Sequence, residues 1–415
     1  MKNNSNIFFK VIKWLYPGMR VKRWIALLTL AVVLITFGSA RLLVEPSVFY
    51  RAFYILAIFT GVFLGILGLR NILGSFINVF IPPGEREIVD MIYRKRYLEK
   101  GPRIVAIGGG TGLSALLYGL KEYTSNISAV VTVADDGGSS GRIRQEFDIL
   151  PPGDIRNCLV ALADAPSLMQ DLFQFRFDTS SELSGHSFGN LFITVMTKLT
   201  GDFEKAVKES SKVLAIRGQV IPSTLNKVSL VARYRDGTTT EGEASIPKKK
   251  QPIAKISLKP QDAIATPEAL KAISEAQAII LGPGSLYTSV IPNLLIKEIR
   301  DAVTASSALK IYICNVMTQL GETEGYSAFD HIKAVIDHSS PKIIDYCVVN
   351  VTHIAKELLD RYSHEYSYPV VVDMEKIRHA GYRVIEADII NAKDYVRHDS
   401  GKLARIISDL IQENF

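Results

Sequence analysis

Cysteine and histidine are scarce in this sequence of 415 residues, and neither occurs in a pattern typical of a metal or disulfide site. An odd number of cysteines cannot form a closed disulfide set, and their spacing fits no zinc or redox motif. Each cysteine lies in an apolar run, which favours a small core residue over a nucleophile. We therefore expect a reducing, cytoplasmic setting and no metal ligands. The cysteines are Cys158, Cys314 and Cys347.

Acidic residues are absent from residues 1–23, although this segment holds six of the basic residues behind the net charge of +6. Later in the chain, no stripe of Lys and Arg is interleaved with aromatic residues, so we expect no nucleic-acid binding. A basic segment before an apolar one is typical of the cytoplasmic flank of a membrane helix. Residues 1–23 are therefore interpreted as a basic cytoplasmic N-terminal segment.

Charged residues are also rare in residues 24–44 and 49–69, where Arg41 and Arg51 are the only ones and stand near the ends. Each segment is long enough to cross about 30 Å of hydrocarbon as a helix. Arginines near the ends can extend their side chains to the far interface. Because the link between the segments is very short, we predict a transmembrane helical hairpin over residues 24–72.

Basic residues flank both ends of this hairpin. The positive-inside rule then predicts a multi-pass protein of the cell membrane, with both termini and the nucleotide-binding domain cytoplasmic. A cleaved signal peptide is disfavoured because a second apolar segment follows and no convincing cleavage site is present. A buried hairpin in a soluble core is disfavoured because neither segment has a polar face. Residues 73–100 are expected to form a charged connector.

The remaining residues, 101–415, alternate short apolar runs with helix-like segments. Such runs are typical of an α/β domain with a mostly parallel sheet and helices on both faces. Residues 228–244 break the pattern, because two segments joined by an Arg-Asp-Gly turn predict an antiparallel hairpin, which we interpret as a lid or edge insertion. We expect strands at 103–107, 127–134, 278–281, 311–316, 348–351 and 370–372.

A glycine-rich turn joins the first expected strand to a helix. Gly109, Gly110, Thr111 and Gly112 stand where a backbone can approach a phosphate closely and where a helix start supplies free N–H groups. A tight turn needs one glycine, whereas four surround Thr111 here. We therefore predict a phosphate-binding loop.

A pair of carboxylates, Asp135 and Asp136, follows the second strand, about where dinucleotide-binding folds place an acid that contacts the ribose. Two acids exceed that need, so the second is a candidate for Mg²⁺ coordination or general-base catalysis. The Gly-Gly-Ser-Ser-Gly run after them, with Ser139 and Ser140, offers backbone N–H groups to an anion. A solvated Asp-Gly turn is the alternative.

Two further polar loops open helices. Asp154 suits a helix N-cap. An N-cap does not explain the neighbouring Arg156 and Asn157, so Asn157 is a ligand candidate. In the Gly-His-Ser-Phe-Gly-Asn motif, His186 and Asn190 are candidates for contact with a base, an amide or a phosphate.

Loops after the later strands carry more hydroxyl and amide groups. Gly284, Ser285 and Thr288 lie in a second glycine turn, which suits a diphosphate or sugar hydroxyls. A polar segment, residues 315–323, follows the next strand. Near the C-terminus, Arg397 is a candidate phosphate ligand, with a solvated surface arginine as the alternative.

Taken in order, these loops resemble those of the YvcK/CofD-like family over about residues 101–415. They are more similar to the bacterial branch called gluconeogenesis factors than to the 2-phospho-L-lactate transferases. The motifs that carry the resemblance are Gly108-Gly-Gly-Thr-Gly112, Asp135-Asp-Gly-Gly-Ser-Ser-Gly141, Pro152-Gly-Asp-Ile-Arg-Asn157, Gly185-His-Ser-Phe-Gly-Asn190, Gly282-Pro-Gly-Ser-Leu-Tyr-Thr-Ser289 and Asn315-Val-Met-Thr-Gln319.

The resemblance implies a Rossmann-like CofD fold. For the gluconeogenesis-factor branch it implies binding of a UDP-sugar (UDP-GlcNAc or UDP-glucose) and regulation of cell shape and envelope synthesis on gluconeogenic carbon. We expect a homo-oligomer, envelope-synthesis proteins as partners, and Mg²⁺ as a candidate cofactor. The alternative is a transferase that uses a nucleotide-activated donor, with Asp135 and Asp136 as catalytic residues. An NAD-dependent dehydrogenase ranks below both because no Tyr-Lys or His-Asp arrangement is evident.

Overall fold

The computed structural model describes residues 21–44, 46–80, 96–178, 182–364, 366–391 and 396–414. The chain divides into two compact units, residues 1–92 and 93–415. Most of the predicted basic N-terminal segment, residues 1–20, and the central part of the predicted connector, residues 81–95, lie outside the described residues.

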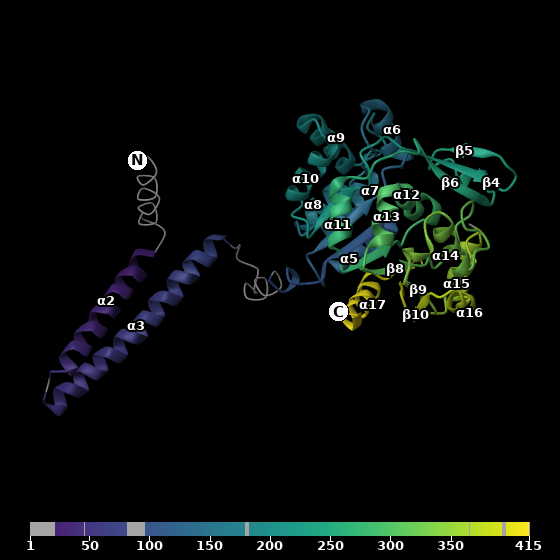
Figure 1. Ribbon diagram of the computed structural model, residues 1–415. Helices are drawn as coiled ribbons and strands as arrows, with labels where there is room; N and C mark the ends of the chain where they lie inside the picture. The colour runs from purple at the N-terminus through teal and green to yellow at the C-terminus, as the bar shows by residue number, and fades with distance from the viewer. Residues whose placement is uncertain are drawn as a thin grey trace. The chain divides into compact units, whose positions relative to one another are not determined.

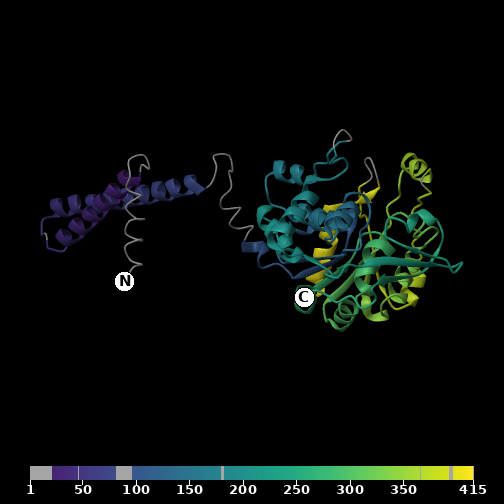
Figure 2. The same cartoon turned by 90° about the horizontal axis from the view of Figure 1, so that it is seen from above.

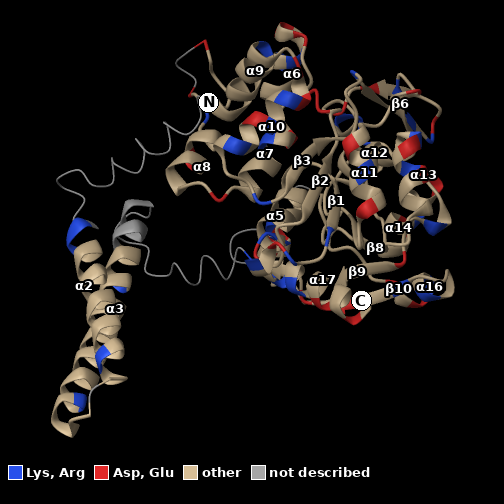
Figure 3. Cartoon of the chain, turned by 60° about the vertical axis from the view of Figure 1, so that its left-hand side comes forward, with Lys and Arg blue, Asp and Glu red and all other residues tan. Residues whose placement is uncertain are grey.

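The first unit is built from two apolar helices, α2 (Val21–Leu42) and α3 (Val48–Phe80), which pack side by side (Figure 1). A Cβ added to Gly61 of α3 would lie 2.7 Å from the Ile35 side chain and 2.9 Å from the Ala31 carbonyl oxygen, so the glycine permits this close packing. Both helices are long and apolar enough to cross a membrane, by length and composition. Neither contains an acidic residue among the described positions (Figure 3).

The two predicted apolar helices are therefore present, with one difference in length. Helix α3 continues to Phe80, eight residues beyond the predicted end at residue 72, so the start of the predicted connector is helical. The run from residue 70 onward has polar residues but no Pro or acidic side chain before Phe80, and nothing in it stops the helix.

The second unit has a sheet at its centre, with helices around it (Figures 1 and 2). Its seven strands follow the order β10-β9-β8-β7-β1-β2-β3. All neighbouring pairs are parallel. This is the doubly wound order with one extra strand at an edge, and the order reverses between β1 and β7. The strands are β1 (Ile104–Gly108), β2 (Ile127–Val131), β3 (Gln219–Pro222), β7 (Ala278–Leu281), β8 (Leu309–Ile313), β9 (Tyr346–Asn350) and β10 (Arg383–Ala387).

The central strands are buried along their whole length, which explains why their sequences are continuously apolar. Helices α5 and α7 pack on one face of the sheet, and α11 packs on the other (Figure 1). The predicted mostly parallel α/β fold is confirmed. The main helices are α5 (Gly110–Leu120), α6 (Gly138–Phe147), α7 (Gly153–Leu162), α8 (Ser167–Gln174), α9 (Phe188–Thr200), α10 (Phe203–Val213), α11 (Pro267–Glu275), α12 (Ile291–Leu295), α13 (Lys297–Ala305), α14 (Ala328–Asp337), α15 (Lys356–Ser363), α16 (Met374–His379) and α17 (Ser400–Asn414).

An antiparallel insertion follows β3, as the hairpin pattern predicts. It consists of β4 (Ser229–Tyr234), β5 (Thr239–Glu241) and β6 (Ile253–Lys259). The third strand was not predicted, although Ile253, Ile256 and Leu258 are buried within it.

Two further predictions about strands need correction. Strands β3 and β10 were not expected, because both lie at an edge of the sheet and neither is a continuous apolar run. Strand β3 ends in Pro222, and β10 contains Arg383 and Glu386. Residues 370–372 are not a strand, and this segment makes only isolated bridges, Met317 with Pro369 and Ser327 with Val371. A run of valines alone therefore does not add a strand here.

Candidate functional site

A cleft of about 980 Å³ lies beyond the carboxyl ends of β1, β7 and β8, where the strand order reverses. Ligands of open α/β sheets bind at such a position. The glycine loop after β1 forms one wall, and the loops after β7 and β8 form the other. Residues near the C-terminus, among them Arg397 and His398, also line the cleft.

The glycine loop starts helix α5 at Gly110, whose φ of +66° lies in the left-handed region. Two of its glycines are also required by packing. A Cβ on Gly112 would lie 2.7 Å from the Pro283 carbonyl oxygen, and one on Gly109 would lie 2.5 Å from Asp154 Oδ2. The loop therefore exposes backbone to the cleft and also fits tightly against its neighbours.

Asp154 is not the N-cap of its helix, contrary to the prediction. Pro152 holds that position in α7, and the Asp154 carboxylate instead accepts a hydrogen bond from the Gly110 N–H. It lines the cleft at the start of α5. Burial, together with the nearby charge of Asp135, raises the pKa of Asp154 to about 6.

A second carboxylate, which is half-buried like that of Asp154, reaches the cleft from the insertion. Burial raises the pKa of Glu243 to about 8, with further contributions from the charges of Asp135 and Asp154. Glu243, Asp135 and Asp154 all line the cleft. Arg397 is the only Lys or Arg among the described residues that do so. The cleft is therefore acidic near β2, and an anionic ligand there must be accompanied by protons or a cation.

The two adjacent aspartates have different roles in the structure. Asp135 lines the cleft and accepts a hydrogen bond of 2.8 Å from the Gly137 N–H. Asp136 does not line it, because its carboxylate accepts a hydrogen bond of 2.8 Å from the Ala244 N–H of the insertion. Asp136 therefore ties the insertion to the end of β2.

The opposite wall offers hydroxyl and amide groups. Gln319 donates a hydrogen bond of 2.9 Å to Ser285 Oγ, and both residues line the cleft. Gln319 Oε1 and His398 Nδ1 are buried and have no partner in the described part of the chain. Burial lowers the pKa of His398 to about 4, so its ring is neutral at pH 7. These atoms are candidates for hydrogen bonds with a ligand.

A buried polar cluster lies beside the cleft without lining it. Asn190 Nδ2 donates to Ser139 Oγ at 3.0 Å, and Ser139 Oγ lies 3.0 Å from His186 Nδ1. Because Ser139 accepts from Asn190, its own proton is available to His186 Nδ1. Burial and the charge of Arg142 lower the pKa of His186, in agreement with a neutral ring. The cluster joins the first turn of α6 to the start of α9, and Asn190 Oδ1 is left without a partner in the described part of the chain.

Other predicted residues also make internal contacts. Arg156 donates to Asn157 Oδ1 at 2.6 Å and to Ser187 Oγ, which joins α7 to α9. Ser140 packs against Gly153. Thr288 donates to Glu322 Oε1 at 3.1 Å, and burial raises the pKa of this carboxyl to about 7.

The structure thus divides the predicted ligand residues into two groups. One group lines the cleft: Gly109, Gly110, Thr111, Gly112, Asp135, Gly284, Ser285 and Arg397. The other group lies outside it: Asp136, Ser139, Ser140, Asn157, His186, Asn190 and Thr288. Sequence reasoning missed Asp154 and Glu243, the first because it suits an N-cap and the second because it lies in the insertion.

These features define an α/β protein with a Rossmann-like sheet and a ligand cleft at its switch point. Residues 104–390 match the family described as 2-phospho-L-lactate transferase CofD, and the chain belongs to this family. A relative from Clostridium acetobutylicum is 46% identical over 97% of this chain and 92% of its own length. The gluconeogenesis factor of Bacillus subtilis is 49% identical over 75% of this chain and 99% of its own length.

A solved structure shares the fold. The crystal structure of a UPF0052 family member from Bacillus halodurans is 47% identical, with a TM-score of 0.72. It covers 74% of this chain and 99% of its own length. That protein therefore corresponds to the second unit alone, so a domain of this kind folds without the apolar hairpin.

Proposed function

We propose that the second unit binds a UDP-sugar, such as UDP-GlcNAc or UDP-glucose, and regulates carbon partitioning and envelope synthesis. One observation carries the proposal: a helix N-terminus, hydroxyl and amide groups, and carboxylates all face a single cleft. The start of α5 and Arg397 suit a diphosphate. The carboxylates of Asp135, Asp154 and Glu243 suit sugar hydroxyls, which donate hydrogen bonds to them.

Mg²⁺ fits this arrangement. The ion is usually held by one or two carboxylates together with substrate phosphates, and Asp135 and Asp154 line the cleft beside the glycine loop. When bound, Mg²⁺ would offset the charge of the diphosphate near these acids. Asp135 and Asp154 would hold it, and Arg397 would still contact the phosphates.

A ligand screen tests the proposal. The purified chain is melted with UDP-GlcNAc, UDP-glucose, GDP and NAD, each with and without Mg²⁺. We expect the UDP-sugars to raise the Tm most, because binding to the folded state stabilises it by mass action. Stabilisation by NAD or GDP alone, with none from a UDP-sugar, would reject the proposal.

A transferase is the second candidate, since the matched family is described by that activity and since Asp154 and Glu243 have pKa values near neutrality. Such groups suit general-base catalysis. Of the two aspartates predicted as catalytic, only Asp135 faces the cleft. Transfer of a group from a nucleotide-activated donor that stops in Asp135→Asn and continues in Asp136→Asn would support this function. If both variants keep the transfer activity, Asp135 is not a catalytic residue.

The proposed place of action is the cell membrane, with α2 and α3 as its anchor. The Clostridium relative aligns over 97% of this chain, so its alignment includes the two apolar helices, whereas the Bacillus subtilis factor aligns over 75%. The hairpin is thus shared by part of the family. A signal sequence would be cleaved, whereas an anchor stays on the mature chain. Intact mass of the protein extracted from membranes distinguishes the two.

A further inference from the structure

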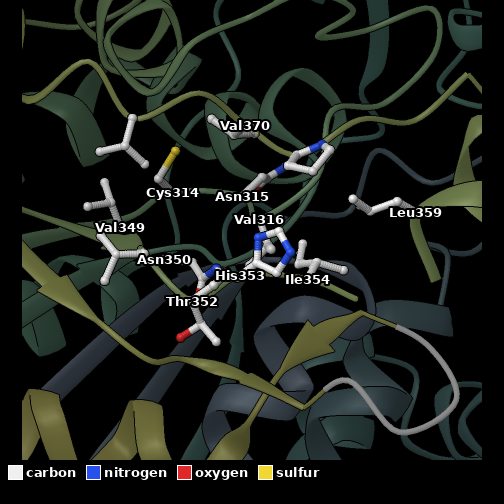
Figure 4. A pocket seen from close by; sticks show the side chains of 13 residues that line it. Cys314, Asn315, Val316, Val349, Asn350, Thr352, His353, Ile354, Leu359 and Val370 are labelled. Carbon is white, nitrogen blue, oxygen red and sulfur yellow. Dashed lines mark hydrogen bonds between the residues drawn. The ribbon is translucent and has the colours of Figure 1, made fainter. Parts of the chain in front are cut away.

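A second cavity of about 510 Å³ lies beyond the carboxyl ends of β8 and β9. We call it the side cavity. It adjoins the cleft, because Asn315 and Val316 line both. The loop after β9, helix α15 and the residues Pro369, Val370 and Val372 form its other walls (Figure 4). None of the residues predicted to bind a ligand lines it.

The side cavity differs from the cleft in chemistry. Its walls are mainly aliphatic, with Val349 on one side and Leu359 on the other facing the space between them (Figure 4). A few polar side chains stand among them, including Asn315, Asn350 and His353. No Lys, Arg, Asp or Glu is among the described residues that line it. A group with apolar faces and a polar edge suits such a lining, whereas a phosphate does not.

Asn315 is placed to form hydrogen bonds with the polar edge of a bound group. It lines both cavities, and its side-chain amide has no hydrogen-bond partner in the described part of the chain. An amide offers a donor and an acceptor together, which is the combination needed to pair with the edge of a base. Asn350 is held in place, because it donates to the Thr352 carbonyl oxygen at 3.0 Å.

The other end of the cleft, near β2, lies against the insertion and is lined by carboxylates. The insertion is tied over the end of β2 by the Asp136 to Ala244 hydrogen bond, and a Cβ on Gly137 would lie 3.4 Å from Ala244 Cβ. The groups that line the cleft there are the carboxylates of Asp135 and Glu243. Carboxylates accept hydrogen bonds from many hydroxyls at once, so this end suits a sugar.

The distance between the two ends fits a nucleotide sugar. Three strand spacings separate β2 from β8, about 14 Å at roughly 4.8 Å per spacing. The loops after β1 and β7, which carry Gly112 and Ser285, lie between them. A diphosphate over these loops would connect a sugar near β2 to a base near β8 and β9.

We infer that the side cavity is the nucleobase site and that the nucleotide lies with its base over β8 and β9 and its sugar beside Asp135, Asp154 and Glu243. This inference rests on the proposed function and adds the orientation of the nucleotide in the cleft. It reverses the prediction from sequence, in which the acids after β2 contact the ribose.

Two neighbouring substitutions test it. Val370 lines the side cavity, whereas Val371 does not and is 68% exposed. Val370→Trp fills the cavity, and Val371→Trp is the matched control. Binding of UDP-GlcNAc, UMP, GlcNAc 1-phosphate and farnesyl diphosphate is measured by calorimetry on the full chain, and circular dichroism checks folding. A second variant, Asn315→Ala, removes the proposed base contact without filling space.

We expect Val370→Trp to weaken the binding of UDP-GlcNAc and UMP at least tenfold and to leave the binding of GlcNAc 1-phosphate unchanged. Asn315→Ala should weaken the two uridine ligands severalfold, and Val371→Trp should weaken none. If Val370→Trp weakens GlcNAc 1-phosphate as much as UMP, or leaves UMP unchanged, the assignment is wrong while the proposed function stands. If Val370→Trp abolishes binding of farnesyl diphosphate but not of UMP, the cavity belongs to an apolar chain. If the wild-type chain binds no uridine ligand, both proposals fail.

Discussion

At the scale of single residues, the cleft is defined by half-buried carboxylates more than by basic side chains. Burial raises the pKa of Glu243 to about 8, so it is mostly protonated at neutral pH, and raises the pKa of Asp154 to about 6, so it loses its proton just below neutrality. An anionic ligand beside them raises both pKa values further, so its binding takes up protons. Ligand affinity is therefore linked to pH.

Without Mg²⁺, the affinity for a nucleoside diphosphate should fall as the pH rises from 6 to 9. Calorimetry in two buffers of different ionisation enthalpy measures the proton uptake directly. Glu243→Gln should flatten the upper part of the pH dependence. The control, Glu241→Gln, removes an exposed partner of Lys259 and should leave it unchanged. An affinity that is constant from pH 6 to 9 would contradict this account.

Asp154 should also make stability depend on pH. Its pKa is raised in the folded state, so its charge is a cost to folding that develops as the pH rises through 4 to 6 and is complete above that. Asp154→Asn keeps an acceptor for the Gly110 N–H and removes the charge. Relative to wild type, the variant should gain about 1 to 2 kcal/mol more at pH 8 than at pH 5.

Urea unfolding of the second unit at the two pH values gives these free energies. Asp164→Asn is the control, because its carboxylate is half-exposed and pairs with Arg217 at the surface. Equal effects of Asp154→Asn at pH 5 and pH 8 would show that the carboxylate carries no such cost.

Residue types predicted the site only in part. Glycines after a strand indicated the phosphate loop, because few other residues permit φ above zero or a carbonyl oxygen at the position of a Cβ. The sequence could not show that Asp154 lines the cleft and that Asp136 does not. Their roles depend on Ala244 and Gly110, which reach them only through the tertiary fold.

At the scale of elements, the apolar hairpin depends on close packing at its glycines. A Cβ on Gly65 would lie 3.7 Å from Ala31 Cβ, a separation that suits a disulfide. The double variant Ala31→Cys, Gly65→Cys should therefore cross-link when membranes are treated with a mild oxidant. The native cysteines are all buried in the second unit and should not interfere.

Adding Gly61→Leu to this pair should lower the cross-linked fraction severalfold, because the new side chain would meet Ile35 and the Ala31 carbonyl oxygen. Gly74→Leu is the matched control on the same helix, since a Cβ there meets nothing within 4 Å. A shift in mobility on a non-reducing gel reports the yield. Equal yields in the two backgrounds would argue against packing at Gly61.

Elements were predictable where local pattern decides them. The central strands are fully buried and short, so their continuous apolar runs predicted both the strands and a parallel sheet. Strand β6 was missed because it follows a basic segment flanked by prolines, which favours a loop. Its pairing with β4 joins residues that are between 19 (Tyr234 with Ile253) and 30 (Ser229 with Lys259) positions apart, and no local pattern encodes it.

At the scale of the whole molecule, the chain joins an apolar hairpin to a domain that relatives possess without it. If the hairpin spans the membrane with both ends inside, Ser47→Cys lies on the outer side and Tyr97→Cys on the inner side. In intact cells, a membrane-impermeant maleimide should label Ser47→Cys and not Tyr97→Cys. Labelling of Tyr97→Cys alone would reverse the topology.

Binding of UDP-GlcNAc to the purified full chain, measured by isothermal titration calorimetry with Mg²⁺ at neutral pH, tests the central claim most directly. Arg397→Gln removes the only Lys or Arg among the described residues that line the cleft, and Arg405→Gln removes an exposed arginine of α17 that pairs with Asp409. The account predicts saturable binding to one site per chain, weakened at least about tenfold by Arg397→Gln and unchanged by Arg405→Gln. No binding by the wild-type chain, or equal binding by both variants, would contradict it.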